Sequence, residues 1–207
     1  MQIRKMTMIL ALGLAACALA ASAPAQAPEI PEAWPDGAKG WPRPDWMELT
    51  AKRLDKAREA RPPGPEIALL HAKATDLLER ARRSTDNRFR FERLIAAVNS
   101  LLDAADRVAW ARKVERTPQD KDFWGAGFVL QGCYFRVRQA EYFATLTEDN
   151  KSEQYVTLAR SLYQQGRGAY DAREYQRARL LGDASSLIVF SLECIAQATI
   201  PDPHIYR

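Results

Sequence analysis

Histidine and cysteine are the side chains best suited to bind metal ions or act as nucleophiles, and this chain has only two histidines and three cysteines. The sequence contains no His-Glu-x-x-His, Cys-x-x-Cys or Gly-x-Ser-x-Gly motif. His71 has no acidic residue three or four positions away, so we expect a surface or rim position for it rather than a role as a metal ligand. The sequence therefore predicts no catalytic residue, no metal site and no cofactor.

Acidic side chains are the next candidates for chemistry, because paired carboxylates can hold metal ions between helices. Glu92, Asp103, Asp106 and Glu141 lie on predicted helices that can face one another. Carboxylate metal sites in helical bundles also use Glu-x-x-His pairs, which the chain lacks. We therefore expect the four acids to form ion pairs with arginines. The candidate arginines are Arg88, Arg93, Arg107, Arg136 and Arg138.

The first twenty residues resemble a secretory signal peptide. Two basic residues precede an uncharged apolar segment, residues 6–16, which is shorter than the roughly 20 residues needed to cross a bilayer. The segment Leu14-Ala15-Ala16-Cys17 resembles a bacterial lipobox, in which Cys17 would be lipidated and become the N-terminus. The small residues at alternate positions, Ala18 and Ala20, alternatively suit cleavage before Ala21. Both alternatives predict a mature protein outside the cytoplasm, periplasmic or secreted, whose only attachment to a membrane would be a lipid on Cys17.

Cys133 and Cys194 are the two cysteines outside this segment. An even number of cysteines in an oxidising compartment permits a disulfide between them. Buried free cysteines, however, also behave as small hydrophobic residues. The sequence leaves both interpretations open.

Residues 21–65 are rich in proline and tryptophan and predict an extended tether with a short helix near 46–60. Asp45 and Glu48 have the spacing of a capping box at the start of that helix. Three tryptophans lie within thirteen residues of this segment: Trp34, Trp41 and Trp46. We expect their rings to clamp the tether onto the helical domain, and the alternative is an aromatic platform for sugar rings or a partner.

Hydrophobic residues recur every three or four positions from residue 66 to residue 200, which predicts an all-α domain followed by a tail, residues 201–207. The predicted helices cover residues 66–83, 88–115, 119–147, 153–170 and 173–199. Short turns between them favour an antiparallel bundle of four to five long helices. Thr117 and Pro118 predict the start of the third of these helices. That helix is apolar around much of its circumference, so we expect it to be central.

Part of the C-terminal half resembles a tetratricopeptide-repeat hairpin. Gly166 and Ala178 lie twelve residues apart, as the two small packing positions of that family do, and Tyr175 stands where the family favours an aromatic residue. The resemblance covers residues 155–185 and implies hairpins like those of the tetratricopeptide repeat, with helices packed through small residues.

The net charge of +4 is too small and too dispersed to predict binding of nucleic acid. Our first hypothesis is an exported, non-enzymatic binding or adaptor protein whose partner is another protein or component of the cell envelope. Its predicted contact residues are Trp34, Trp41, Trp46, Arg173 and Arg177. The alternative is a carrier that holds a small apolar ligand in the core of the bundle. Its predicted pocket residues are Phe91, Val98, Gly127, Phe128, Gln131 and Tyr134. An enzyme of unknown class is the third hypothesis.

Overall fold

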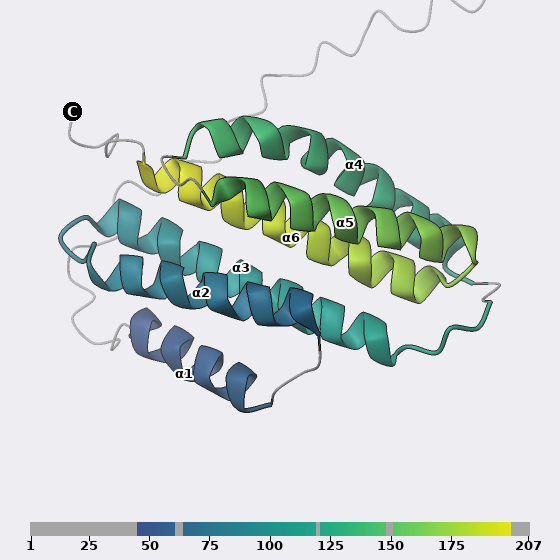
Figure 1. Cartoon of the computed structure of the whole chain (residues 1–207), viewed down its shortest axis with the longest axis horizontal. Helices are drawn as coiled ribbons and strands as arrows, with labels where there is room; N and C mark the ends of the chain where they lie inside the picture. The colour runs from purple at the N-terminus through teal and green to yellow at the C-terminus, as the bar shows by residue number, and fades with distance from the viewer. Residues whose placement is uncertain (1–44, 61–63, 119–120, 148–150, 200–207) are drawn as a thin grey trace, which may run out of the picture. The chain divides into compact units, whose positions relative to one another are not determined.

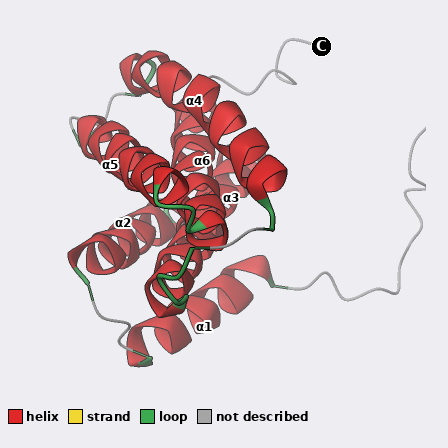
Figure 2. Cartoon of the chain, turned by 90° about the vertical axis from the view of Figure 1, so that its right-hand side faces the viewer, coloured by secondary structure: helices red, strands yellow, loops and turns green. Residues whose placement is uncertain are grey.

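A computed structural model of the chain describes residues 45–60, 64–118, 121–147 and 151–199. Six α-helices account for 86% of these residues, and none of them lies in a strand (Figure 2). The predicted all-α fold class is therefore confirmed. The predicted signal peptide with Cys17, most of the tether with Trp34 and Trp41, and the tail lie outside the described residues.

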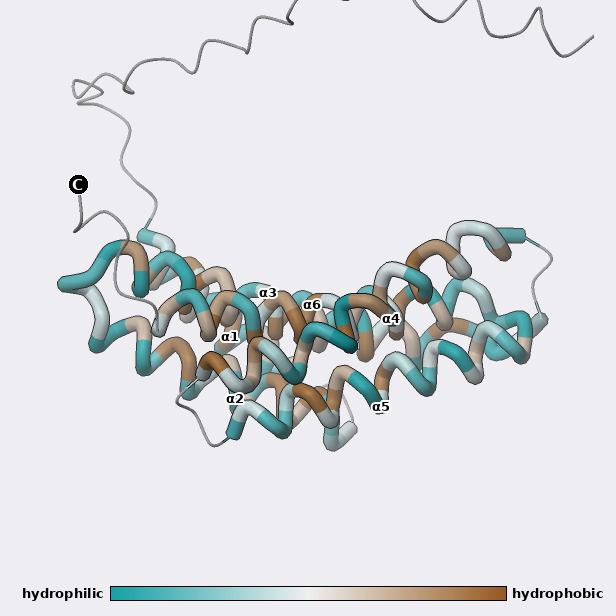
Figure 3. The backbone as a smooth tube through the Cα atoms, turned by 90° about the horizontal axis from the view of Figure 1, so that it is seen from above, coloured by the Kyte–Doolittle hydropathy of each residue, from teal (hydrophilic) through white to brown (hydrophobic). Residues whose placement is uncertain are grey.

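The six helices follow the predicted order closely. They are α1 (Trp46–Glu59), α2 (Pro65–Arg82), α3 (Arg88–Lys113), α4 (Phe123–Thr145), α5 (Ser152–Asp171) and α6 (Tyr175–Thr199). Successive helices run in opposite directions (Figure 1). Hydrophobic and hydrophilic stretches alternate along each helix, as amphipathic packing requires (Figure 3). The positions of the helices were therefore largely predictable from local periodicity.

Side chains at the helix starts explain some of these boundaries. The Asp45 carboxylate accepts hydrogen bonds from the backbone N–H groups of Met47 and Glu48, at 3.0 and 3.1 Å, and so caps α1. The predicted start of α4 at Thr117 and Pro118 is wrong, because the helix begins at Phe123. Asp122, just before it, has φ of +71°, a left-handed conformation that no α-helix can continue through.

The centre of the fold is α6, which packs against α3, α4 and α5. It is the only described helix long and apolar enough to cross a membrane, but 67% of its most apolar window is buried inside the protein. Two of its buried hydroxyls are satisfied by neighbouring backbones. Ser185 donates to the carbonyl oxygen of Ala159 in α5 at 2.7 Å, and Ser191 donates to that of Ala97 in α3 at 3.2 Å. The expectation that the helix at 119–147 is central is therefore wrong, since α4 packs mainly against α5 and α6, at the edge of the fold.

Helix α1 packs against α2 and α3 through the buried Leu54 and through polar contacts. The Arg53 guanidinium bridges Asp103 and Asp106 of α3, and the Asn99 amide donates to the Thr50 hydroxyl at 3.3 Å. Trp46 at the start of α1 is 58% exposed, so the expected clamp onto the helices is wrong for this tryptophan.

Helices α5 and α6 approach each other closely at Gly166. A Cβ atom on Gly166 would lie 3.1 Å from a methyl group of Leu130 and 3.3 Å from the carbonyl oxygen of Ala178. The two small residues singled out in the sequence therefore do meet in the hairpin. The wider resemblance to a tetratricopeptide repeat stays a prediction. Gly168, two residues later, has no neighbouring atom within 4 Å of the same position.

This contrast predicts opposite effects for two identical substitutions. Gly166→Ala should lower the free energy of unfolding by about 1 kcal/mol, because the new methyl group meets backbone that is unable to move away. Gly168→Ala should raise it by about 0.5–1 kcal/mol, because alanine favours the helix and meets open space. Urea unfolding followed by circular dichroism measures both. Stabilisation by both substitutions would contradict the described packing of α5 on α6.

Candidate functional site

Helix α4 carries two regularly spaced stripes on opposite sides, one of them buried and the other exposed. The inner stripe is buried against the other helices and consists of Ala126, Leu130, Cys133, Val137, Ala140 and Ala144. The outer stripe, which we call the aromatic ridge, consists of Trp124, Phe128, Gln131, Phe135, Arg138 and Tyr142, all exposed. Both stripes have the alternating spacing of four and three residues that is typical of helices packed on both sides.

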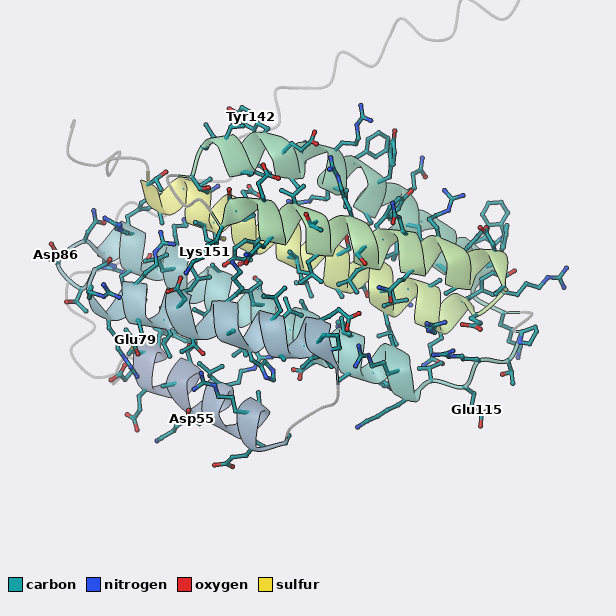
Figure 4. All side chains as sticks on the ribbon, in the orientation of Figure 1. Asp55, Glu79, Asp86, Glu115, Tyr142 and Lys151 are labelled. Atoms are coloured by element: carbon teal, nitrogen blue, oxygen red, sulfur yellow. The ribbon has the colours of Figure 1, made fainter. Side chains whose placement is uncertain are left out.

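The rings of the aromatic ridge are unusually open to solvent. Trp124 is 85% exposed and Phe128 is 78% exposed, and Phe135 and Tyr142 are both more than half exposed. Figure 4 labels Tyr142 on the side of α4 that points away from α5 and α6. Aromatic side chains bury roughly 150–250 Å² each, so the four rings present on the order of 500 Å² of apolar surface. A patch of that size often marks an interaction site.

A cluster of rings fixes the first turn of α4 and therefore the start of the ridge. Phe123, Tyr170 and Tyr175 come from three different helices, and their ring centroids lie 5.4–5.7 Å apart. Trp124 packs edge-on against Phe123, with the centroids 5.4 Å apart. The most exposed ring of the ridge is therefore attached to a point where α4, α5 and α6 meet.

A groove of about 490 Å³ lies beside the ridge, between α4 and α5. Its lining residues are Gly127, Leu130, Gln131, Tyr134, Phe135, Tyr163, Arg167 and Tyr170. Gly127 leaves space for the Tyr170 hydroxyl, because a Cβ atom on this glycine would lie 3.2 Å from that oxygen. The rings of Tyr134 and Tyr163 face each other across the two helices, with centroids 6.2 Å apart.

Arg167 is the charged residue of the groove. The hydrogen bond between Arg167 and the Tyr163 hydroxyl raises the pKa of the guanidinium, so Arg167 stays positively charged. Phenol and guanidinium groups together can bind both aromatic surfaces and anionic groups. The groove and the ridge share Gln131 and Phe135, so the two features form one continuous face.

The structure separates the residues predicted to line a ligand pocket. Gly127, Gln131 and Tyr134 lie in the groove, whereas Phe128 lies on the exposed ridge. Val98 is fully buried in the core, and Phe91 is partly buried against it. The expected pocket between 88–115 and 119–147 is therefore not formed, because α4 packs on α5 and α6 rather than on α3.

Three groove residues were missed by the sequence analysis, although they carry a local signal. Tyr163, Arg167 and Tyr170 are spaced by four and three residues, so they share one face of α5. The predicted contact residues Arg173 and Arg177 lie elsewhere, at the start of α6. Arg173 is exposed at φ of +61°, and Arg177 pairs with Glu174 at 2.7 Å.

The acidic residues form ion pairs, partly as expected. Glu92 pairs with Arg88 at 2.7 Å, as predicted, but Asp103 and Asp106 pair with Arg53, and Glu141 pairs with Arg160. The described residues contain no group of three or more histidine, cysteine or acidic side chains placed to hold a metal ion.

His71 is more buried than the expected surface or rim position, because it is only 9% exposed. Burial lowers its pKa, and the charge of Arg58 acts in the same direction against the opposing effect of Asp106.

Cys133 and Cys194 are both free and buried in the structure. The Cys133 thiol lies within hydrogen-bonding reach of Ser185 and Ser186 in α6. Cys194 lies nine positions beyond Ser185 in the same helix, about 13 Å along its axis, near Arg93. The Cα atoms of a disulfide lie within about 7 Å, so the candidate bridge does not fit this structure. Burial raises the pKa of both thiols, that of Cys194 to about 11.

No protein-family model, curated protein or solved structure matches the chain. The geometry of the α4 and α5 face is therefore the basis on which function is argued. That face has a row of exposed rings, a groove with three tyrosines and one charged side chain within it.

Thiol accessibility tests the placement of the two cysteines. In a Cys17→Ser form of the protein, neither remaining thiol should react with a thiol reagent at pH 8, because both are buried and protonated. Unfolding in guanidinium without reductant should release both thiols for reaction. If no thiol appeared until a reductant was added, the two cysteines would be bonded and the described register of α4 on α6 would be wrong.

Proposed function

We propose that this protein is an exported, non-enzymatic binding protein of the cell envelope, which docks a helix of a partner protein on the aromatic ridge of α4. The observation that carries the proposal is the exposure of Trp124, Phe128 and Phe135 along one stripe. Export is supported by the signal-like sequence of residues 1–20.

The spacing of the ridge favours a helix as the docked element. Its side chains alternate by four and three residues, which is the pattern with which one helix packs into the side chains of another. Tryptophan, tyrosine and arginine are also the residues that most often dominate the free energy of protein–protein binding. The ridge contains all three, together with two phenylalanines.

Charge further defines the partner. Arg138 lies within the ridge, and Arg167 lies in the adjacent groove. A partner helix with an apolar face flanked by acidic residues would complement both the rings and the two guanidinium groups. The apolar area of the ridge, on the order of 500 Å², leaves room for such a polar rim within a standard interface of about 800 Å² per partner.

A triple substitution tests this proposal. A photo-crosslinking residue at position 128 should capture one partner in cells, and the same residue at Trp110, an exposed position on α3, should not. With the captured partner purified, the variant Trp124→Ala, Phe128→Ala, Phe135→Ala should bind it at least about a hundredfold more weakly. Trp110→Ala is the matched control and should leave the affinity unchanged. Both variants should stay folded, because the altered side chains are exposed.

Two results would overturn the proposal. The first is an unchanged affinity of the triple variant for the captured partner. The second is crosslinking of position 128 to a second copy of the chain, with a dimer in size-exclusion chromatography, since the ridge would then be a self-association surface.

A small-ligand carrier is the second candidate, and the groove favours it. The volume of about 490 Å³ lies within the range of small-molecule sites, roughly 300–1,000 Å³. The ligand would combine a ring or chain held by Tyr134 and Tyr163 with an anionic or polar group at Arg167. Native mass spectrometry of the purified protein should then show a bound species, which Tyr163→Ala and Arg167→Gln should remove. A spectrum of the unliganded mass alone would exclude this candidate.

A further inference from the structure

A second hollow, of about 350 Å³, lies where the end of α3 meets α5 and the start of α6. We call it the arginine pocket. Its lining residues are Val108, Ala111, Arg112, Arg116, Gln165, Arg177 and Leu181. Three of these seven residues are arginines, one is a glutamine and none is acidic. The lining therefore offers guanidinium and amide N–H donors, and the ion pairs of Arg112 and Arg177 offset part of its positive charge.

Two of the guanidinium groups are held in place by acids that do not line the pocket. Arg112 of α3 forms an ion pair with Glu66 of α2. Arg177 of α6 pairs with Glu174 at 2.7 Å, and both side chains of that pair are mostly buried. Such pairs orient the planar guanidinium groups in advance, so less conformational entropy is lost when a ligand binds.

Arg116 completes the set from the segment that follows α3, where it is exposed. Apolar side chains form the remainder of the lining, chiefly Val108 and Leu181. The arginine pocket thus has two chemical surfaces, one cationic and one apolar. Its volume far exceeds the roughly 30 Å³ of a water molecule and suits an ion that carries a small organic group.

We propose that the arginine pocket binds a small phosphate monoester. A phosphate monoester carries a charge of about −1.5 to −2 at neutral pH and has three strong acceptor oxygens. These oxygens match the paired N–H donors of guanidinium groups better than a single carboxylate does. The ester group lies against Val108 and Leu181, and the Gln165 amide supplies a further donor. This site is separate from the ridge and the groove, with which it shares no residue.

Calorimetric titration of the full chain with phenyl phosphate and with inorganic phosphate, at constant ionic strength, tests the proposal. Phenyl phosphate should bind several-fold more tightly than inorganic phosphate, because its ring covers the apolar lining. Arg116→Gln should weaken binding of phenyl phosphate about tenfold, since a hydrogen bond to a charged group is lost. Arg116→Glu should weaken it further. Arg116 lies outside the helices, so circular dichroism should show both variants folded.

Arg90→Gln is the matched control, because it removes one exposed arginine from the start of α3, at the opposite end of that helix from the arginine pocket. It should leave the affinity for phenyl phosphate unchanged. Equal weakening by the control would mean that the anion binds to general surface charge. An unchanged affinity of Arg116→Glu for phenyl phosphate would refute the proposed site. If the protein bound anionic phospholipid vesicles but not phenyl phosphate, the proposal would be wrong and the arginines would bind a membrane surface instead.

Discussion

Burial of α6 on three sides is the constraint from which the rest of the structure follows. Each of its neighbours, α3, α4 and α5, buries an apolar stripe against α6. Small residues such as Ala178, Gly182 and Ala184 allow three helices to approach one helix this closely. The buried hydroxyls of Ser185 and Ser191 find carbonyl oxygens on α5 and α3, so polar atoms in this core do not oppose folding.

The position of α4 at the edge of this core explains the candidate site. Its buried side consists largely of small residues, three of them alanines, and its large aromatic residues lie on the solvent side. Packing against α5 and α6 therefore leaves these rings exposed. An edge helix that served stability alone would carry polar residues there. Under the proposed function, the exposed rings are the part of the hydrophobic surface reserved for a partner.

The sequence was sufficient to predict the positions of the helices but not to predict which of their faces are exposed. The spacing of hydrophobic residues by three and four positions is a local property of a helix. The residues around Leu94 and around Leu162 were therefore enough to predict the helices that contain them. The same spacing appears twice on α4, and both the stripe at Leu130 and the stripe at Phe128 carry large apolar side chains. Which stripe is buried depends on the neighbours of α4, and these are set by contacts between residues far apart in the sequence.

Local chemistry by itself determined the all-α class, the cap at Asp45 and most helix boundaries, because these depend on residues within a few positions of one another. Tertiary structure alone decided that α6 is central, that the two buried cysteines lie apart, and that Tyr163 meets Tyr134. It also brought Arg116 to the same hollow as Arg177, which follows it by 61 positions. The physical reason is that the interior has room for only some of the apolar faces. Which face of a helix is buried therefore depends on the other helices and not on its own sequence alone.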